Sequence, residues 1–195
     1  MRRIAAALIF STAATFAFAQ APQNTNIRGE IASFDGKTIT IKATDGQSVA
    51  VELPESVNVA ITKPFTMADV KPGMKLGVTT IKRGEQTIAI DVRPISAAAP
   101  DGLSAYDLQP QSTMTNAIAD ATAQSATGNE LTLNYKTGTI KVMVPPGTPM
   151  SQAAPGARTD VKAGETIFVA ARKGDDGKLV AARVQVSKDG VKPTQ

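Results

Sequence analysis

The sequence predicts an all-β protein built from two tandem small antiparallel β-barrels that arose by internal duplication. Three observations lead to this prediction. Apolar residues alternate with polar ones in short runs, dipeptides that end in glycine separate these runs, and the pattern of the first half recurs about 92 residues later in the second. Alternation with a period of two is typical of strands with one buried face, and glycine accepts the positive φ that tight hairpin turns require.

The first half is expected to hold five strands. Their approximate positions are residues 27–34, 38–43, 48–53, 74–81 and 86–93. Turns at Asp35-Gly36 and Asp45-Gly46 separate the first three strands. Between the third and fourth strands, Thr66 and Asp69 have the spacing of a capping box, which predicts a single helical turn that Pro72-Gly73 ends.

The second half repeats this arrangement, with strands expected at 117–124, 130–135, 139–144, 166–172 and 179–186. Four blocks match in the same order: 36–41 with 128–133, 49–54 with 140–145, 69–73 with 160–164, and 88–92 with 180–184. A period of this length is too long for a solenoid unit, so it indicates a duplicated domain.

Five short antiparallel strands with a helical turn after the third fit an OB-like barrel, and an SH3-like barrel is the alternative. We therefore expect a first barrel in residues 20–94 and a second in residues 115–187. Residues 95–114, rich in alanine, proline and glutamine, are expected to link the two barrels, and residues 188–195 to form a loose tail.

The N-terminal segment has the pattern of a secretory signal peptide. Met1-Arg2-Arg3 is followed by a largely apolar run from Ile4 to Ala19. This run is shorter than the roughly 20 residues that span a bilayer, which favours cleavage after residue 19 over a membrane anchor. We expect export by the general secretory route, to the periplasm of a Gram-negative cell or to the exterior of another. The mature chain has no further apolar stretch of spanning length.

Composition excludes several classes of function. The sequence contains no cysteine, histidine or tryptophan, so it has no Ser-His-Asp triad, Cys-His nucleophile, histidine or cysteine zinc site, or disulfide. Acids such as Glu52, Asp91 and Glu130 are scattered, and several lie on strand faces that are expected to be solvated, so we expect no enzyme and no cofactor. Without Arg2 and Arg3 the chain has 19 basic and 17 acidic residues, a net charge of +2 spread over both halves, which argues against a nucleic-acid partner.

The pattern of Gly29 and Ile31, Asp35-Gly36, Asp45-Gly46 and Asp69-Val70-Lys71-Pro72-Gly73, together with the segment Asp107 to Asn116, carries a resemblance. It resembles a group of proteobacterial secreted two-repeat proteins with OB-like domains of unknown function. Members often have Trp where Tyr106 stands and Gly where Gln111 stands. Automated naming sometimes calls them metal-transporter permeases, but the mature chain lacks a segment that could span a membrane. The resemblance implies a fold and a compartment, not an activity.

Two groups of residues are candidates for ligand binding. Tyr106, Asp107 and Gln109 lie in the expected linker, and interfaces between domains often hold ligand clefts. The alternative is that Tyr106 packs the two barrels together. The basic pairs Lys82-Arg83 and Arg172-Lys173 occupy equivalent hairpin ends, where they could contact an anionic polymer or head group or lie in solvent.

A second function class is cation binding. Asp175 and Asp176 offer oxygen ligands, and Met143 and Met150 offer thioethers. A hairpin turn at Asp175-Asp176 and core packing of the methionines are the simpler interpretations. We therefore expect a non-catalytic protein of the cell envelope that binds an envelope protein or an anionic polymer, with periplasmic cation binding as the alternative.

Overall fold

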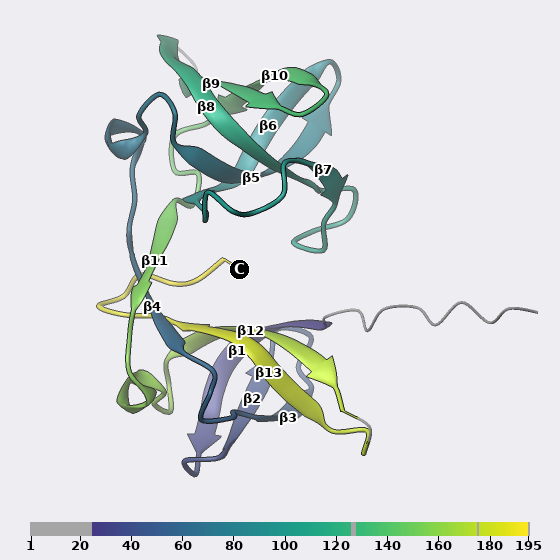
Figure 1. The fold of residues 1–195 in the computed structure, drawn as a ribbon, viewed down its shortest axis with the longest axis vertical. Coiled ribbons are helices and arrows are strands. Elements are labelled where there is room, and N and C mark those ends of the chain that lie inside the picture. Colours follow the sequence, from purple (N-terminus) through teal and green to yellow (C-terminus); the bar gives the residue numbers. More distant parts are fainter. Residues whose placement is uncertain (1–24, 126–127, 175, 195) are drawn as a thin grey trace, which may run out of the picture.

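The computed structural model describes residues 25–125, 128–174 and 176–194. Its strands form two closed five-stranded barrels, one above the other in Figure 1, which confirms the predicted fold class. Within the described ranges, no helix has the length and hydropathy needed to cross a membrane.

The first barrel contains β1 (Thr25–Phe34), β2 (Thr38–Ala43), β3 (Ser48–Glu52), β12 (Thr166–Lys173) and β13 (Leu179–Val186). Antiparallel pairs join β1 to β2 and β12, β2 to β3, and β12 to β13. A parallel pair between β3 and β13 closes the barrel. The third and last strands of the barrel thus run side by side, which is the strand order of an OB-type barrel.

The second barrel has the same order, built from β8 (Thr113–Ser125), β9 (Gly128–Tyr135), β10 (Gly138–Val144), β5 (Lys75–Arg83) and β6 (Gln86–Pro94). Here β5 pairs with β6 and β8, β9 pairs with β8 and β10, and β10 meets β6 in parallel. A short strand, β7 (Gly102–Ala105), pairs in antiparallel fashion with the first residues of β8, from Thr113 to Asn116.

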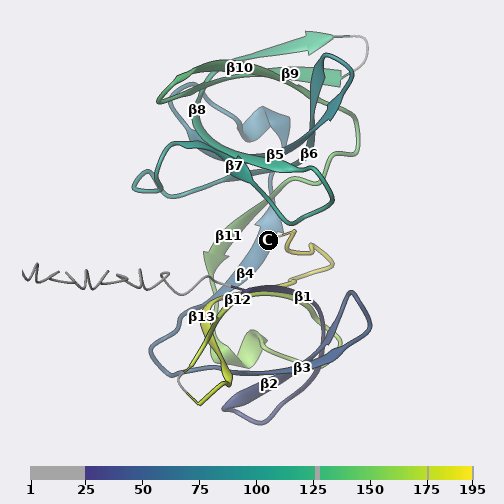
Figure 2. The same ribbon diagram turned by 90° about the vertical axis from the view of Figure 1, so that its right-hand side faces the viewer.

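The two barrels exchange strands between the halves of the chain. Each takes its first three strands from one half and its last two from the other, so the barrels do not coincide with residues 20–94 and 115–187. The chain leaves the first barrel along β4 (Val59–Pro64) and returns along β11 (Ser151–Pro155). These two strands pair in antiparallel fashion and form the ribbon that joins the barrels in Figures 1 and 2.

Each apolar core therefore mixes residues from both halves. In the first barrel Ile41 and Val51 pack in one cluster with Val169 and Val184. In the second, residues such as Leu76 and Val78 pack with Leu131 and Leu133.

Short 3-10 turns lie after the connecting strands, namely η1 (Met67–Asp69) and η2 (Arg158–Asp160). The Asp69 carboxylate accepts hydrogen bonds from the Thr66 backbone N–H at 2.9 Å and from its hydroxyl at 2.7 Å. This confirms the helical turn expected after Thr66.

The structure differs from the sequence prediction in two connecting segments. Residues 95–112 link β6 to β8 within the second barrel and are not the link between barrels. The tail is not loose: Pro193 is buried, and Thr194 contacts residues of both barrels. The segment of residues 95–112 and the C-terminal segment both reach the space between the barrels (Figure 2).

Candidate functional site

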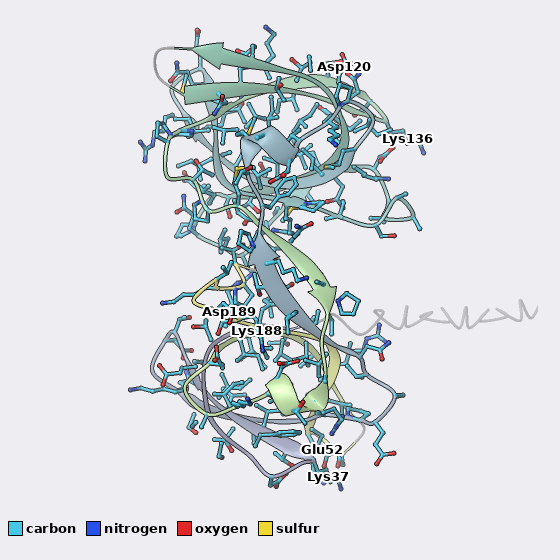
Figure 3. The ribbon with its side chains drawn as sticks, turned by 90° about the vertical axis from the view of Figure 1, so that its left-hand side faces the viewer. Lys37, Glu52, Asp120, Lys136, Lys188 and Asp189 are labelled. Atoms are coloured by element: carbon cyan, nitrogen blue, oxygen red, sulfur yellow. The ribbon has the colours of Figure 1, made fainter. Side chains whose placement is uncertain are left out.

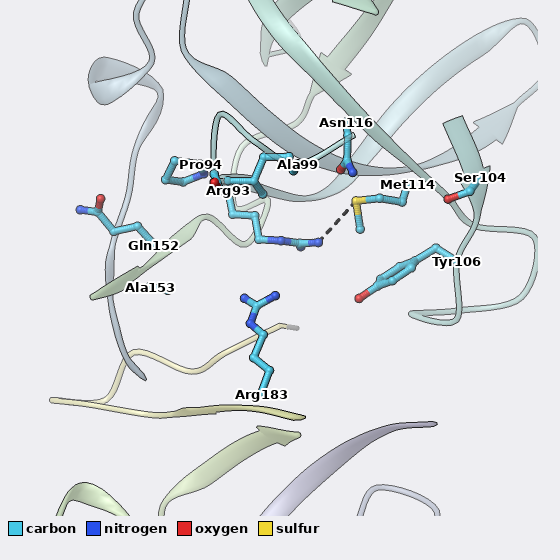
Figure 4. A pocket seen from close by; sticks show the side chains of 12 residues that line it. Arg93, Pro94, Ala99, Ser104, Tyr106, Met114, Asn116, Gln152, Ala153 and Arg183 are labelled. Carbon is cyan, nitrogen blue, oxygen red and sulfur yellow. Dashed lines mark hydrogen bonds between the residues drawn. The ribbon is translucent and has the colours of Figure 1, made fainter. Parts of the chain in front are cut away.

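A cleft of about 760 Å³ lies between the two barrels, and side chains of both line it (Figure 4). The lining residues come from β6 and the segment after it, from the β7–β8 region, from β11 and from β13. They are Arg93, Pro94, Ile95, Ser96, Ala99, Ser104, Tyr106, Met114, Asn116, Gln152, Ala153 and Arg183. The lining thus combines two guanidinium groups and a phenol with several apolar side chains.

Arg93 is a buried cation at the edge of this cleft. Its side chain is 8% exposed, and Nη1 forms an ion pair with Oδ2 of Asp91, which is fully buried. Nη2 contacts the Met114 sulfur at 3.4 Å, and Nε has no hydrogen-bond partner among the described residues. Burial lowers the pKa of Arg93, Asp91 opposes this effect, and the nearby charges of Arg183 and Arg28 lower the pKa further.

Asp91 holds elements from both ends of the chain. Besides its ion pair with Arg93, its Oδ1 accepts a hydrogen bond from the Thr194 hydroxyl. Burial raises the pKa of Asp91, and the charge of Arg93 opposes that rise. Unlike the acids expected on solvated strand faces, Asp91 is buried, and the C-terminal segment contacts it through Thr194.

Arg28 on β1 connects the first barrel to the loop of the second. Its Nη2 donates to the Tyr106 hydroxyl at 3.2 Å and to Oδ1 of Asp107 at 2.9 Å. The guanidinium carbon lies 5.6 Å from the centre of the Tyr106 ring and 5.3 Å from that of Phe168. Tyr106 therefore packs the barrels together, as one of the two sequence interpretations predicts, and its ring also lines the cleft.

Arg183 enters the cleft from the first barrel, as Figure 4 shows, with Arg93 on the opposite side. Its Nη2 lies 3.4 Å from Oε1 of Gln185, and its guanidinium lies 5.8 Å from the centre of the Phe168 ring. Burial lowers the pKa of Arg183, and interaction with Tyr106 raises it. Three arginines from β1, β6 and β13 therefore converge on one interface.

The sequence candidates lie at different distances from the cleft. Of the three linker candidates, Tyr106 lines the cleft, Asp107 lies beside it through Arg28, and Gln109 is exposed and outside the lining. Arg28, Arg93 and Arg183 were missed. One sequence feature could have indicated Arg93: it and Asp91 flank the apolar Val92 within a predicted strand. A charged pair of this kind is also typical of a solvated strand face, so it did not single out a buried site.

The two basic pairs lie on different barrels. Lys82 and Arg83 end β5, and Arg172 and Lys173 end β12. All four are exposed, and Lys82 donates to the Thr87 hydroxyl at 2.8 Å. The structure therefore does not bring the pairs together into one anionic binding surface.

The candidate cation ligands are separated as well. Met143 faces Ile88 across the β10–β6 pair and Met150 faces Val92, four positions further along β6. Asp176 is in the other barrel, where its carboxylate accepts the Lys178 backbone N–H at 3.0 Å, while Asp175 lies outside the described residues. The part of the chain that the structure describes has no group of three or more histidine, cysteine, aspartate or glutamate residues that could hold a metal.

Comparisons of the chain with protein-family models, with curated proteins and with solved structures find no significant match.

Proposed function

We propose that this chain is a non-catalytic binding protein of the cell envelope whose ligand places an anionic group in the cleft between the barrels. The observation that carries the proposal is the convergence of two guanidinium groups, Arg93 of the second barrel and Arg183 of the first, on the lining of the cleft from opposite sides (Figure 4). Export to the envelope rests on the sequence of residues 1–19, outside the described ranges.

The described residues of the protein do not satisfy all the hydrogen-bond donors of the Arg93 guanidinium. A buried donor without an acceptor destabilises a protein by roughly 1–3 kcal/mol, and more where the donor is charged. Both Asp91 oxygens already accept bonds, one from Arg93 Nη1 and the other from Thr194. Nη2 of Arg93 contacts the Met114 sulfur, which is a weak acceptor, so a carboxylate or phosphate oxygen in the cleft would be a stronger partner for this end of the guanidinium.

The other cationic groups support the same ligand chemistry. Arg28 and Arg183 are close enough to Arg93 to lower its pKa, so these guanidiniums repel one another. An anion between Arg93 and Arg183 relieves this repulsion, and the planar guanidinium matches a carboxylate or phosphate through paired hydrogen bonds. Pro94, Ile95 and Met114 provide apolar contact for the carbon part of such a ligand.

Binding without catalysis is the simpler activity for these residues. The cleft lining offers guanidinium, phenol, amide and hydroxyl groups, and no carboxylate or imidazole is among the lining side chains. Proton transfer in most enzymes depends on a carboxylate, an imidazole or an amine with a pKa near the working pH.

Calorimetric titration of the chain with acetate, benzoate and inorganic phosphate tests the proposal. We expect at least one of these anions to bind, and Arg183→Gln to weaken it about tenfold or more, since a charge-assisted hydrogen bond contributes about 1.5–3 kcal/mol. Arg172→Gln, which removes the same charge from an exposed hairpin, is the matched control and should bind normally. Absence of binding by all three anions, or equal weakening in both variants, would contradict the proposal.

A further inference from the structure

The C-terminal segment runs from the first barrel into the space between the barrels. After β13 ends, the backbones of Lys188 and Val191 hydrogen-bond to each other in a turn, which Figure 3 marks by Lys188 and Asp189. The segment then continues through the buried Pro193 to Thr194, and in Figure 1 its end lies between the two barrels. The segment thus brings Thr194 to the interface between the barrels.

Thr194 is held by both barrels at once. Its backbone carbonyl accepts a hydrogen bond of 3.2 Å from Arg28 Nε of the first barrel. Its hydroxyl donates to the buried Asp91 of the second barrel. The hydrogen bond to the backbone carbonyl can form with any residue at this position. The hydrogen bond to Asp91 requires a side chain that can donate.

The residues that hold this segment also contact residues that line the cleft. Arg28, which binds Thr194, also binds Tyr106, and Asp91, which binds Thr194, is also the partner of Arg93. Tyr106 and Arg93 both line the cleft. The binding position of Thr194 is therefore separated from the cleft residues Tyr106 and Arg93 by a single side chain in each case, Arg28 and Asp91.

We infer that the space between the barrels is a binding groove for an extended peptide, and that residues 191–194 are its resident occupant. The inference rests on the proposed function in one respect: the anionic group that reaches Arg93 is a carboxylate of the peptide. A peptide from a partner protein binds by taking the place of the segment at Arg28 and Asp91.

Tethering makes the resident segment a strong competitor. A segment joined to its site by a short linker has an effective concentration on the order of millimolar. A free peptide of equal intrinsic affinity therefore binds the intact chain weakly and binds well only when the segment is removed or loosened. This dependence is the signature that separates a groove occupied by its own chain from an ordinary structural contact.

The test uses a fluorescent peptide with the sequence of residues 188–194, acetylated at its N-terminus and with a free carboxylate at its C-terminus. Fluorescence anisotropy measures its binding to the full chain, to the full chain with Thr194→Ala, and to a chain that ends at Val191. We expect binding to the Thr194→Ala chain to be at least tenfold tighter than to the unchanged chain, and binding to the shortened chain to be tighter still. The same peptide with alanine in place of its threonine is the control and should bind poorly to all three.

Equal affinity for the unchanged and Thr194→Ala chains, or for the two peptides, would overturn the inference. Thermal melting establishes that each variant folds, and if the shortened chain does not melt cooperatively, the comparison with Thr194→Ala decides alone.

The anion titration separates the two proposals. If an anion binds and the peptide does not, the proposed function stands and the peptide groove is contradicted. If the peptide binds, Arg183→Gln does not weaken it, and no anion binds, the peptide groove stands and the proposed anion site is contradicted.

Discussion

Arg28 and Asp107, 79 positions apart in the chain, form an ion pair with 2.9 Å between Nη2 and Oδ1. Arg28 belongs to the first barrel, and Asp107 belongs to the loop that precedes β8 in the second. Asn26 donates to the other Asp107 oxygen at 3.0 Å. One carboxylate therefore joins the loop to β1 and holds the Tyr106 ring in the wall of the cleft.

Replacing this carboxylate should loosen the loop in a pH-dependent way. Burial raises the pKa of Asp107, but the hydrogen bond and charge of Arg28 outweigh burial and lower it overall. A carboxyl whose pKa is lowered on folding stabilises the protein above its unfolded pKa, near 4, and this contribution disappears as the pH falls through the folded value. We expect Asp107→Asn to lower the free energy of unfolding at pH 7 by less than about 1 kcal/mol, because half of the side chain is exposed.

Urea unfolding at pH 7 and at pH 3 measures this effect. The difference between the unchanged chain and Asp107→Asn should be present at pH 7 and should shrink at pH 3. Asp120→Asn is the control, since Asp120 is exposed and Figure 3 places it on the far side of the second barrel. A pH-independent loss in Asp107→Asn would show that packing, and not charge, accounts for the contact.

The buried pair of Asp91 and Arg93 should show strong coupling. Asp91→Ala leaves the guanidinium of Arg93 without its carboxylate and removes the acceptor of Thr194, so we expect a loss of about 3–5 kcal/mol in the free energy of unfolding. Adding Arg93→Met removes the uncompensated charge, and the double variant should be more stable than Asp91→Ala alone. Denaturant unfolding of the two single variants and the double variant measures the coupling, and simple additivity of the losses would contradict it.

The backbone at Gln111 offers a stabilising substitution. Gln111 has φ of 62°, in the left-handed region that costs a non-glycine residue roughly 1–2 kcal/mol. Gln111→Gly removes this strain but adds freedom to the unfolded chain, so we expect a net gain of no more than about 1 kcal/mol. Gln109→Gly, at a position without positive φ, should instead destabilise the loop. Thermal melting of both variants tests this, and a loss in Gln111→Gly would contradict it.

The local pattern of the sequence was sufficient for the strands that form the barrels. In β2, for example, Ile39 and Ile41 are fully buried and alternate with the half-buried Thr38 and Thr40, as period-two alternation requires. The connecting strands β4 and β11 were not predicted. They pair with each other across 87 or more positions of the chain, and a local sequence pattern does not indicate a pairing over that distance. The shortest of those separations joins Pro64 to Ser151.

The exchange of strands was beyond sequence reasoning for a related physical reason. The apolar patterns of β5 and β6 resemble those of β12 and β13, so the local pattern does not show which barrel each pair of strands completes. The difference lies in where β4 and β11 direct the chain. The candidate site depends on this choice, because only the observed arrangement covers Asp91 and brings Arg28, Arg93 and Arg183 together.

The exchanged topology predicts which parts of the chain fold alone. The apolar core of the second barrel lies wholly between Phe65 and Met150, whereas the core of the first barrel needs residues from both ends of the chain. A fragment of residues 65–150 should therefore fold and melt cooperatively. A fragment of residues 20–94 should not fold, because it has the first three strands of one barrel and the last two of the other.

The first barrel can be isolated by removing the second. Pro64 and Ser151 face each other at the end of the β4–β11 pair, so an Asn-Gly turn between them would close a hairpin. We expect a chain of residues 20–64, Asn-Gly and residues 151–195 to fold as one barrel, with the amide dispersion of a β protein in NMR spectra. It should also lose anion binding, because Arg93, Tyr106 and Met114 are absent. Cooperative folding of residues 20–94 alone, together with failure of this shortened chain to fold, would instead indicate barrels made of contiguous halves.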